Sequence, residues 1–202
     1  LGEAPKPRGG SPMNLYLADL HFCHQSVALQ RGFSTYHEQD ETILKSLRDR
    51  SDPNSTLFIL GDLFSYRFDP HILEELAALY GTRVLLRGNH EVNHWMRQFS
   101  DTALLARTFA DICDWLDISD QDRPVRMSHA PISGLAPGDG SYYLHGHIHR
   151  DPPRGLHEQV LCANPHVLNT SLDVISLVHP WGYPCTLEEL IVCNRLWKGE
   201  WA

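Results

Sequence analysis

Five short blocks of aspartate, asparagine and histidine punctuate the chain between residues 19 and 149. In the first block, Asp19-Leu20-His21, the carboxylate and the imidazole are two positions apart, so they point to the same side of an extended chain. Each block follows a stretch that is typical of a β-strand, which suggests that the blocks form one site. The other four are Gly61-Asp62, Gly88-Asn89-His90, His129 and Gly146-His147-Ile148-His149.

Seven side chains in these blocks offer an oxygen or nitrogen atom to a metal ion. Such a mixture suits Mn, Fe, Zn, Co or Ni in a five- or six-coordinate site and does not suit a soft copper site. Seven ligands are too many for one ordinary ion and fit two ions that share a ligand. The predicted ligands are Asp19, His21, Asp62, Asn89, His129, His147 and His149.

Asp62 is the expected shared ligand, because a carboxylate has two oxygens and a negative charge and this one follows the central apolar strand. Two cations roughly 3.5–4 Å apart lower the pKa of a shared water and neutralise the charge that grows on a phosphate during hydrolysis. The leaving alkoxide then needs a proton. His90, beside Asn89, is the predicted general acid, and Glu91 is a candidate to orient it.

The first half of the chain alternates between strand and helix patterns. A β-prone run at 14–18 precedes a helix that begins with the capping box Thr35/Glu38 and ends near Arg50. An apolar strand at 57–60, a helix that starts at Asp69-Pro70 and closes at Gly81, and a strand at 84–86 follow. This β-α-β-α-β order predicts parallel strands whose carboxyl ends carry the ligand site.

The second half is expected to be mainly β, which makes the fold class α/β (α+β). We predict a helix over 93–110, broken near Ser100-Asp101, and a hairpin formed by 114–118 and 124–128 that ends at His129. Two facing mixed sheets with helices outside would accommodate these elements. The remaining predicted strands are 142–144, 167–169, 174–177 and 191–193.

Composition narrows the class of protein. The 202 residues carry a formal net charge of −8 and have a pI near 5.9, so no general nucleic-acid-binding surface and no obligate nucleic-acid partner is evident. The 13 histidines invite a metal explanation. No apolar run resembles a membrane span or a signal peptide. The oligomeric state is not readable from the sequence.

The five cysteines are odd in number, and none forms a Cys-x-x-Cys pair. The sequence therefore predicts neither a disulfide framework nor a zinc–thiolate site, and it favours reduced thiols in a cytoplasmic protein. Residues 1–12 are rich in Gly and Pro and lack an initial Met. We expect them to be a disordered tail or a cloning remnant, followed by a single domain over 13–202.

The ordered blocks Asp19-x-His21, Gly61-Asp62, Gly88-Asn89-His90, His129 and Gly146-His147-x-His149 together resemble the calcineurin-like metallophosphoesterase superfamily. In detail the chain is similar to the small single-domain phosphoesterases of bacteria and phages. Their first block often reads Asp-Leu-His-Phe-Gly-His, whereas this chain has Cys23 in place of the glycine. The segment 169–174 also resembles a short strand of that group.

The resemblance implies a four-layer α-β-β-α sandwich of two mixed sheets flanked by helices. It also implies a cofactor of two divalent transition-metal ions, with Mn²⁺ first and Fe, Zn, Ni or Co as alternatives. One ion would be held by Asp19, His21, Asp62 and His149, the other by Asp62, Asn89, His129 and His147, and His90 would be the acid.

We therefore expect a hydrolase of phosphodiesters or phosphomonoesters that acts by attack of a metal-bound hydroxide. Its substrate would be a small phosphoester, with a nucleotide among the candidates, and the residues that bind it cannot be named. A nucleotide pyrophosphatase, a nuclease, a protein phosphatase and a non-catalytic binding or scaffold protein remain alternatives.

Several neighbouring residues have a structural explanation as well as a functional one. Cys23 is read as a small residue in a turn, and His145 as a strand residue or an indirect support of the metals. His24 is placed on the surface or beside the metal ligands. Tyr66 and Arg67 are assigned to a solvated loop, and Arg87 to a structural ion pair.

Overall fold

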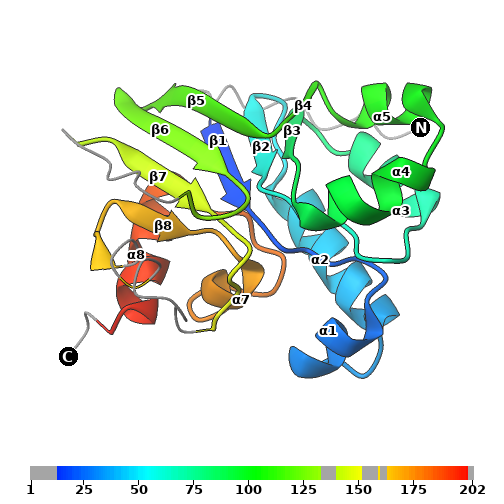
Figure 1. Cartoon of the computed structure of the whole chain (residues 1–202), viewed down its shortest axis with the longest axis horizontal. Helices are drawn as coiled ribbons and strands as arrows, with labels where there is room; N and C mark the ends of the chain where they lie inside the picture. Colours follow the sequence, from blue (N-terminus) through cyan, green and yellow to red (C-terminus); the bar gives the residue numbers. More distant parts are fainter. Residues whose placement is uncertain (1–12, 133–139, 152–158, 160–162, 200–202) are drawn as a thin grey trace, which may run out of the picture.

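The computed structural model describes residues 13–132, 140–151, 159 and 163–199. Two four-stranded sheets lie side by side, with helices flanking both (Figure 1). This confirms the predicted α-β-β-α class. The expected tail at 1–12 lies outside the described residues, as do one of the 13 histidines, His157, and one of the five cysteines, Cys162. Within the described parts, no helix has the length and apolar character needed to cross a membrane.

The first sheet is entirely parallel, in the order β1-β2-β3-β4, whereas both sheets were predicted to be mixed. The first three strands match the predicted apolar runs, and their last three residues are buried because both faces of the sheet are covered. The short fourth strand was not predicted. The bounds are β1 Met13–Leu17, β2 Ser55–Ile59, β3 Thr82–Leu86 and β4 Asp111–Cys113.

Two of the helix starts follow the predicted capping chemistry. The Thr35 hydroxyl accepts a hydrogen bond from the Glu38 N–H at 3.2 Å, but the Glu38 carboxylate returns to Ser34 N rather than to Thr35 N. Asp69 accepts from His71 N at 2.9 Å, with Pro70 at the first helical position. These helices are α2 Tyr36–Arg50 and α3 Pro70–Ala77, and α1 Gln25–Gln30 precedes them.

The helix predicted over 93–110 is three pieces. It begins as a π-helix, η1 Glu91–Trp95, which continues into α4 Met96–Gln98. After the break, which includes the predicted Ser100-Asp101, the Asp101 carboxylate caps α5 Thr102–Thr108. The early π-helical turn keeps Glu91 and Trp95 buried beneath the loop that follows β3.

The second sheet begins with the predicted hairpin. Strands β5 Trp115–Asp120 and β6 Arg123–Ser128 are antiparallel, and β7 Tyr142–His145 and β8 Val167–Asn169 then add in parallel. Since β6, β7 and β8 run in one direction, their carboxyl ends meet at one edge of the sheet.

The strands predicted at 174–177 and 191–193 are wrong, because 191–193 lies within α8 and 174–177 covers the end of α7 and the turn after it. Ser171 caps α7 Leu172–Ile175, and Thr186 caps α8 Leu187–Trp197 in a full capping box with Glu189. The apolar residues of α8 fall at helical spacing, and Leu187, Leu190 and Cys193 are buried. Short apolar runs do not distinguish a buried helix from a strand by themselves.

Backbone hydrogen bonds join the two halves of the molecule beside β1. Ala18 N donates to Thr170 O at 2.8 Å, and Leu172 N donates to Ala18 O at 3.1 Å. Further back, Tyr16 and Cys185 exchange both of their backbone hydrogen bonds. The chain that leaves β1 therefore runs beside the chain that leaves β8, and the residues that follow the strands of both sheets converge.

Candidate metal centre

All predicted ligands lie in loops that follow the carboxyl ends of strands. These loops run side by side, since His21 N donates to Asp62 O at 3.0 Å and Gly146 N donates to His129 O at 2.8 Å. The order is Asp19 and His21 after β1, Asp62 after β2, Asn89 and His90 after β3, His129 after β6, and His147 and His149 after β7.

The side chains gather in overlapping groups whose nitrogen and oxygen atoms lie within 4.8 Å of one another. One group is Asp19, His21 and His149, and another is Asp62, His129 and His147. Asp62 connects them, because its Oδ1 lies 3.4 Å from His129 Nε2 and its Oδ2 lies 3.9 Å from His21 Nε2. The geometry places the seven side chains together; their assignment as ligands stays a prediction.

In the second group, the tautomer of His129 turns an unprotonated ring nitrogen toward two oxygen atoms. His129 Nδ1 lies 2.8 Å from the Leu60 carbonyl, which can only accept, so the ring proton is on Nδ1 and Nε2 presents a lone pair. That lone pair faces Asn89 Oδ1 at 3.1 Å and Asp62 Oδ1 at 3.4 Å. A cation among these atoms would be bound by the His129 lone pair and by both oxygens.

The first group has the same character. His149 Nδ1 lies 2.9 Å from Asp173 Oδ2, so this nitrogen carries a proton, and Nε2 faces His21 Nε2 at 3.1 Å. His21 Nδ1 is buried and has no hydrogen-bond partner. A metal ion between the rings would use the lone pairs on both Nε2 atoms, so the residues present fit the implied ions.

Burial also shifts the pKa values of side chains in the metal-free centre. It raises the pKa of Asp62 to about 7, with the nearby Asp19 adding to the effect against the opposing influence of His129. Burial, with Arg31 and the neighbouring rings, lowers the pKa of His21 well below its usual value. The pKa of His149 is raised instead, because its hydrogen bond to Asp173 and the charges of Asp19 and Asp173 outweigh burial. Neutral imidazoles are the form that binds metal ions, so a metal ion would displace the extra proton of a charged His149.

Five of the seven predicted ligands have left-handed backbone conformations, which residues other than glycine rarely adopt. The φ angles are 58° for Asp19, 50° for His21, 53° for Asp62, 71° for His147 and 48° for His149. Strain of this kind persists only where the surroundings enforce it, and it concentrates at functional sites.

Two glycines let the loops approach closely. A Cβ on Gly61, whose φ is +85°, would lie 2.4 Å from His129 Nδ1. A Cβ on Gly88 would lie 2.4 Å from Asp62 Oδ1. Each glycine therefore leaves room for a predicted ligand that another strand supplies.

A model of the calcineurin-like phosphoesterase family matches residues 15–156, which include every one of these side chains. The chain belongs to this family. Its fold is similar to that of a protein of unknown function from Aquifex aeolicus, with 21% identity over 88% of this chain and 96% of that chain and a TM-score of 0.63. No curated protein matches it.

Two more solved structures are weaker matches to this phosphoesterase. One is a novel archaeal phosphodiesterase, with 15% identity over 79% of this chain and 82% of that chain and a TM-score of 0.44. The other is Yfce, a phosphoesterase from E. coli, with 16% identity over 78% of this chain and 77% of that chain and a TM-score of 0.43.

The expected role of Glu91 in the phosphoesterase is wrong. Its fully buried carboxylate accepts hydrogen bonds from the backbone N–H groups of Asp62, Leu63 and Gly88, at 2.7–2.8 Å, and does not orient His90. It also accepts from Trp95 Nε1 at 3.2 Å. Glu91 instead clamps the loop after β2 to the loop after β3.

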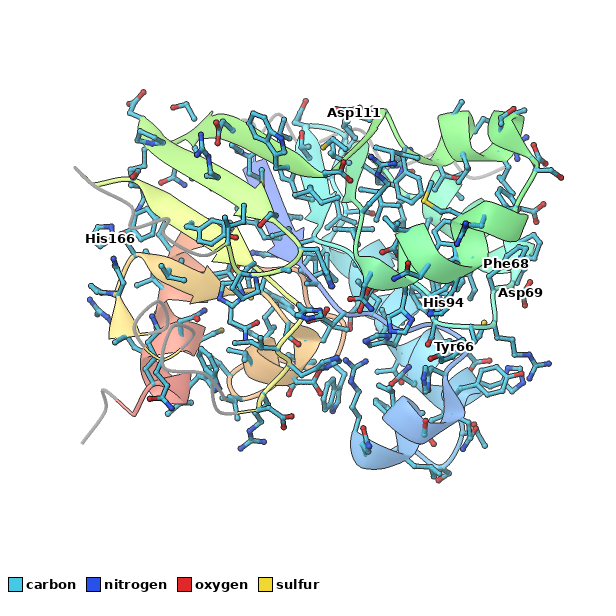
Figure 2. All side chains as sticks on the ribbon, in the orientation of Figure 1. Tyr66, Phe68, Asp69, His94, Asp111 and His166 are labelled. Carbon is cyan, nitrogen blue, oxygen red and sulfur yellow. The ribbon has the colours of Figure 1, made fainter. Side chains whose placement is uncertain are left out.

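His90 is oriented by other neighbours. Its Nδ1 lies 3.3 Å from Ser65 Oγ, and its Nε2 lies 3.7 Å from Asp62 Oδ2. The exposed Tyr66 ring packs edge-on against it, and Tyr66 and His94 lie together beside it (Figure 2). Burial and the nearby His94 lower the pKa of His90 to about 4 in the absence of ligands, so the free imidazole is neutral at pH 7.

Two residues that support the centre were missed by sequence reasoning. Asp173, on α7, accepts the hydrogen bond from His149, and Arg31 donates to both Asp173 oxygens at 2.7 and 3.1 Å. The Arg31 guanidinium also donates to Asp19 O at 2.6 Å and Leu20 O at 3.0 Å. The segment 169–174 was expected to be a short strand, but it contains the end of β8 and the start of α7. Nothing in the sequence distinguishes Asp173 or Arg31.

The other candidates of the sequence have ordinary partners. His24 Nδ1 accepts from Val27 N at 3.3 Å and caps α1, and Arg87 forms the predicted structural ion pair, with Asp114. His145 is fully buried, with Nδ1 2.9 Å from Gly146 O. Cys23 has φ 62°, a left-handed conformation that glycine adopts more readily than other residues. The Arg67 guanidinium lies 5.8 Å from the centre of the Tyr36 ring.

Proposed function

We propose that this phosphoesterase hydrolyses phosphodiester or phosphomonoester bonds with two divalent transition-metal ions, Mn²⁺ first among Mn, Fe, Zn, Ni and Co. The observation that carries the proposal is the approach of Asn89 Oδ1 and Asp62 Oδ1 to His129 Nε2, at 3.1 and 3.4 Å. Asp62 would be the shared ligand because each of its oxygens faces a different group of side chains.

When bound, the ions would activate a water molecule and neutralise charge on the phosphoryl oxygens. The protein supplies the other functions. His90 lies at the rim, with its side chain 17% exposed, where it can reach a leaving-group oxygen. Near pH 7 the free imidazole holds no second proton, so we propose that the negative charge of bound phosphate favours the imidazolium that donates it.

The substrate would be small or extended, since the centre is open on one side. His147 is exposed, and His149 borders a cavity of about 520 Å³ whose wall includes Arg150 and Trp181. An arginine and an aromatic ring suit a phosphoester that carries an aromatic group, such as a nucleotide.

The first experiment measures bound metal and, with added Mn²⁺, hydrolysis of a chromogenic aryl phosphodiester, the matching monoester and an alkyl phosphodiester. Asp62→Asn is expected to lose most bound metal and activity. His90→Asn is expected to keep its metal but lose about 10²–10⁴-fold in kcat on an alkyl phosphodiester, which has a poor leaving group, and less on the aryl ester. The exposed His71→Asn is the matched control.

Two outcomes would contradict the proposal. One is wild-type protein that holds less than one ion per chain after incubation with Mn²⁺ and turns over neither ester. The other is an active protein whose activity is unchanged in Asp62→Asn, which would place the chemistry elsewhere.

A further inference from the structure

A second group of metal-binding side chains lies apart from the phosphoesterase centre. His179, Cys185 and Cys193 offer one nitrogen and two sulfur atoms that all lie within 4.8 Å of one another. Both cysteines are fully buried, and His179 is half-buried. None of the three belongs to the groups around Asp19 and Asp62.

Three separate pieces of chain bring these residues together. His179 follows α7, Cys185 is paired through its backbone with Tyr16 of β1, and Cys193 lies on the buried face of α8. The cysteines are eight positions apart in the sequence, with the start of α8 between them. Without a Cys-x-x-Cys pair the sequence predicts no zinc–thiolate site, but the fold makes the two sulfur atoms neighbours.

The surroundings hold the imidazole in place. The His179 ring stacks on the Tyr183 ring, with centroids 4.4 Å apart and an interplanar angle of 9°. The Tyr183 hydroxyl donates to Glu189 Oε1 at 2.9 Å. Arg50 lies 4.8 Å from the centre of the Tyr183 ring. Its positive charge is paired with the Glu189 carboxylate at 2.9 Å, which reduces its repulsion of a metal ion bound nearby.

Two thiolates and one imidazole are a ligand set that proteins use for Zn²⁺, with a fourth position left for water or another ligand. Hard ions such as Mg²⁺ and Mn²⁺ prefer oxygen, so this set selects against them. His179 is partly exposed, and both cysteines are fully buried.

We propose that His179, Cys185 and Cys193 bind a thiophilic divalent ion, expected to be Zn²⁺, at a site separate from the phosphoesterase centre. The bound ion would tie the segment after α7 to α8 and to the chain paired with β1. The thiols would release their protons to solvent on binding, which makes the affinity fall as the pH is lowered.

The alternative is that the two cysteines are only small apolar residues of the core. Burial accounts for Cys185 and Cys193, and stacking on Tyr183 accounts for the His179 ring, but neither accounts for the convergence of one imidazole nitrogen with both sulfurs within 4.8 Å. A disulfide between the two cysteines is the other competing arrangement, and it would remove both thiolates from the ligand set.

Cobalt distinguishes these possibilities, because Co²⁺ bound to thiolate has a near-ultraviolet sulfur-to-metal charge-transfer band. The seven predicted ligands of the phosphoesterase centre include no sulfur. Metal-free protein, kept reduced with a non-thiol reductant, is titrated with Co²⁺ alone and then with Zn²⁺. We expect a thiolate band that Zn²⁺ abolishes, and that remains in Asp62→Asn and in the control Cys113→Ser, whose thiol is free and lies outside the group.

Cys193→Ser and Cys185→Ser are expected to weaken or remove the band and to lower the number of bound ions by one per chain. His179→Ala serves as a variant outside the buried core, so that loss of folding does not explain its effect; it should lower Co²⁺ affinity at least tenfold. The proposal is overturned by the absence of a thiolate band in folded wild-type protein, by a band that persists at full intensity in both serine variants, or by a Cys185–Cys193 disulfide found by mass spectrometry.

Discussion

His149 donates a hydrogen bond from Nδ1 to Oδ2 of Asp173 across 2.9 Å, which fixes the tautomer that turns the Nε2 lone pair toward His21. The pair connects the loop after β7 to α7. Arg31 holds the same carboxylate and also the carbonyl of Asp19, so the positions of two predicted ligands depend on one guanidinium. Carboxylates of this kind tune a metal site from outside its ligands.

Replacing the charged partner of His149 should weaken metal binding. Asp173→Asn keeps the size of the side chain but removes the negative charge, and we expect the affinity for Mn²⁺ to fall roughly 10–100-fold. Calorimetric titration of metal-free protein measures the change. The exposed Asp49→Asn is the control, and equal affinities in the two variants would show that Asp173 has no influence on the metals.

The buried clamp at Glu91 should matter for stability. In Glu91→Gln the new amide donor faces backbone N–H groups that need an acceptor, so we expect the free energy of unfolding to fall by about 3 kcal/mol. Urea denaturation followed by circular dichroism gives the value. Glu41→Gln, at an exposed position of α2, should change it little. A loss no larger than that of the control would mean that the clamp is replaced by water.

Room at Gly88 should be essential for the position of Asp62. In Gly88→Ala the new Cβ meets Asp62 Oδ1 at 2.4 Å and Asp62 N at 2.8 Å, so we expect most bound metal and activity to be lost. In Gly32→Ala the Cβ meets nothing within 4 Å, but φ is +87°. That variant should lose about 1 kcal/mol of stability through backbone strain and keep its activity. The metal content of both variants tests this prediction, and a Gly88→Ala protein that binds as much metal as Gly32→Ala would contradict it.

Asp40 should make stability depend on pH. Burial raises the pKa of this carboxyl from 3.8 to about 6, so the folded chain favours the protonated form. Its contribution to the free energy of unfolding is complete below about pH 4 and is lost as the pH rises through about 6, by at most about 3 kcal/mol.

Asp40→Asn removes this titration and can still accept the hydrogen bond from Cys23 N. Urea unfolding of chelator-treated wild type and variant from pH 4 to 7.5 should therefore show the variant gaining stability relative to wild type as the pH rises. A difference that stays constant across the range would place the pKa of Asp40 near its ordinary value.

Sequence reasoning found the elements whose signals are local. The apolar runs of β1, β2 and β3 and the cap at Asp69 depend on a few adjacent residues, and the spacing of Asp19 and His21 places both after one strand. It failed where a short apolar run fits both a strand and a buried helix. The segment around Val192 was read as a strand although Thr186 and Glu189 signal the start of a helix.

The missed parts of the candidate site are those that only the fold brings together. Arg31 and Asp173 lie 142 positions apart, and neither has a motif of its own. The three-residue strand β4 exists because β3 offers it an edge. The role of Glu91 was misjudged because adjacency to His90 in the sequence was taken for contact, whereas the π-helical turn directs its carboxylate to backbone N–H groups.

The left-handed backbone at Asp19, His21, Asp62, His147 and His149 implies a stability–activity trade-off. Each such residue costs on the order of 1–3 kcal/mol relative to a relaxed conformation. Glycine at any of these positions would relieve that strain and remove a donor atom. Selection for folding alone would therefore favour glycines here, and variants at these positions that gain thermal resistance should do so at the expense of turnover.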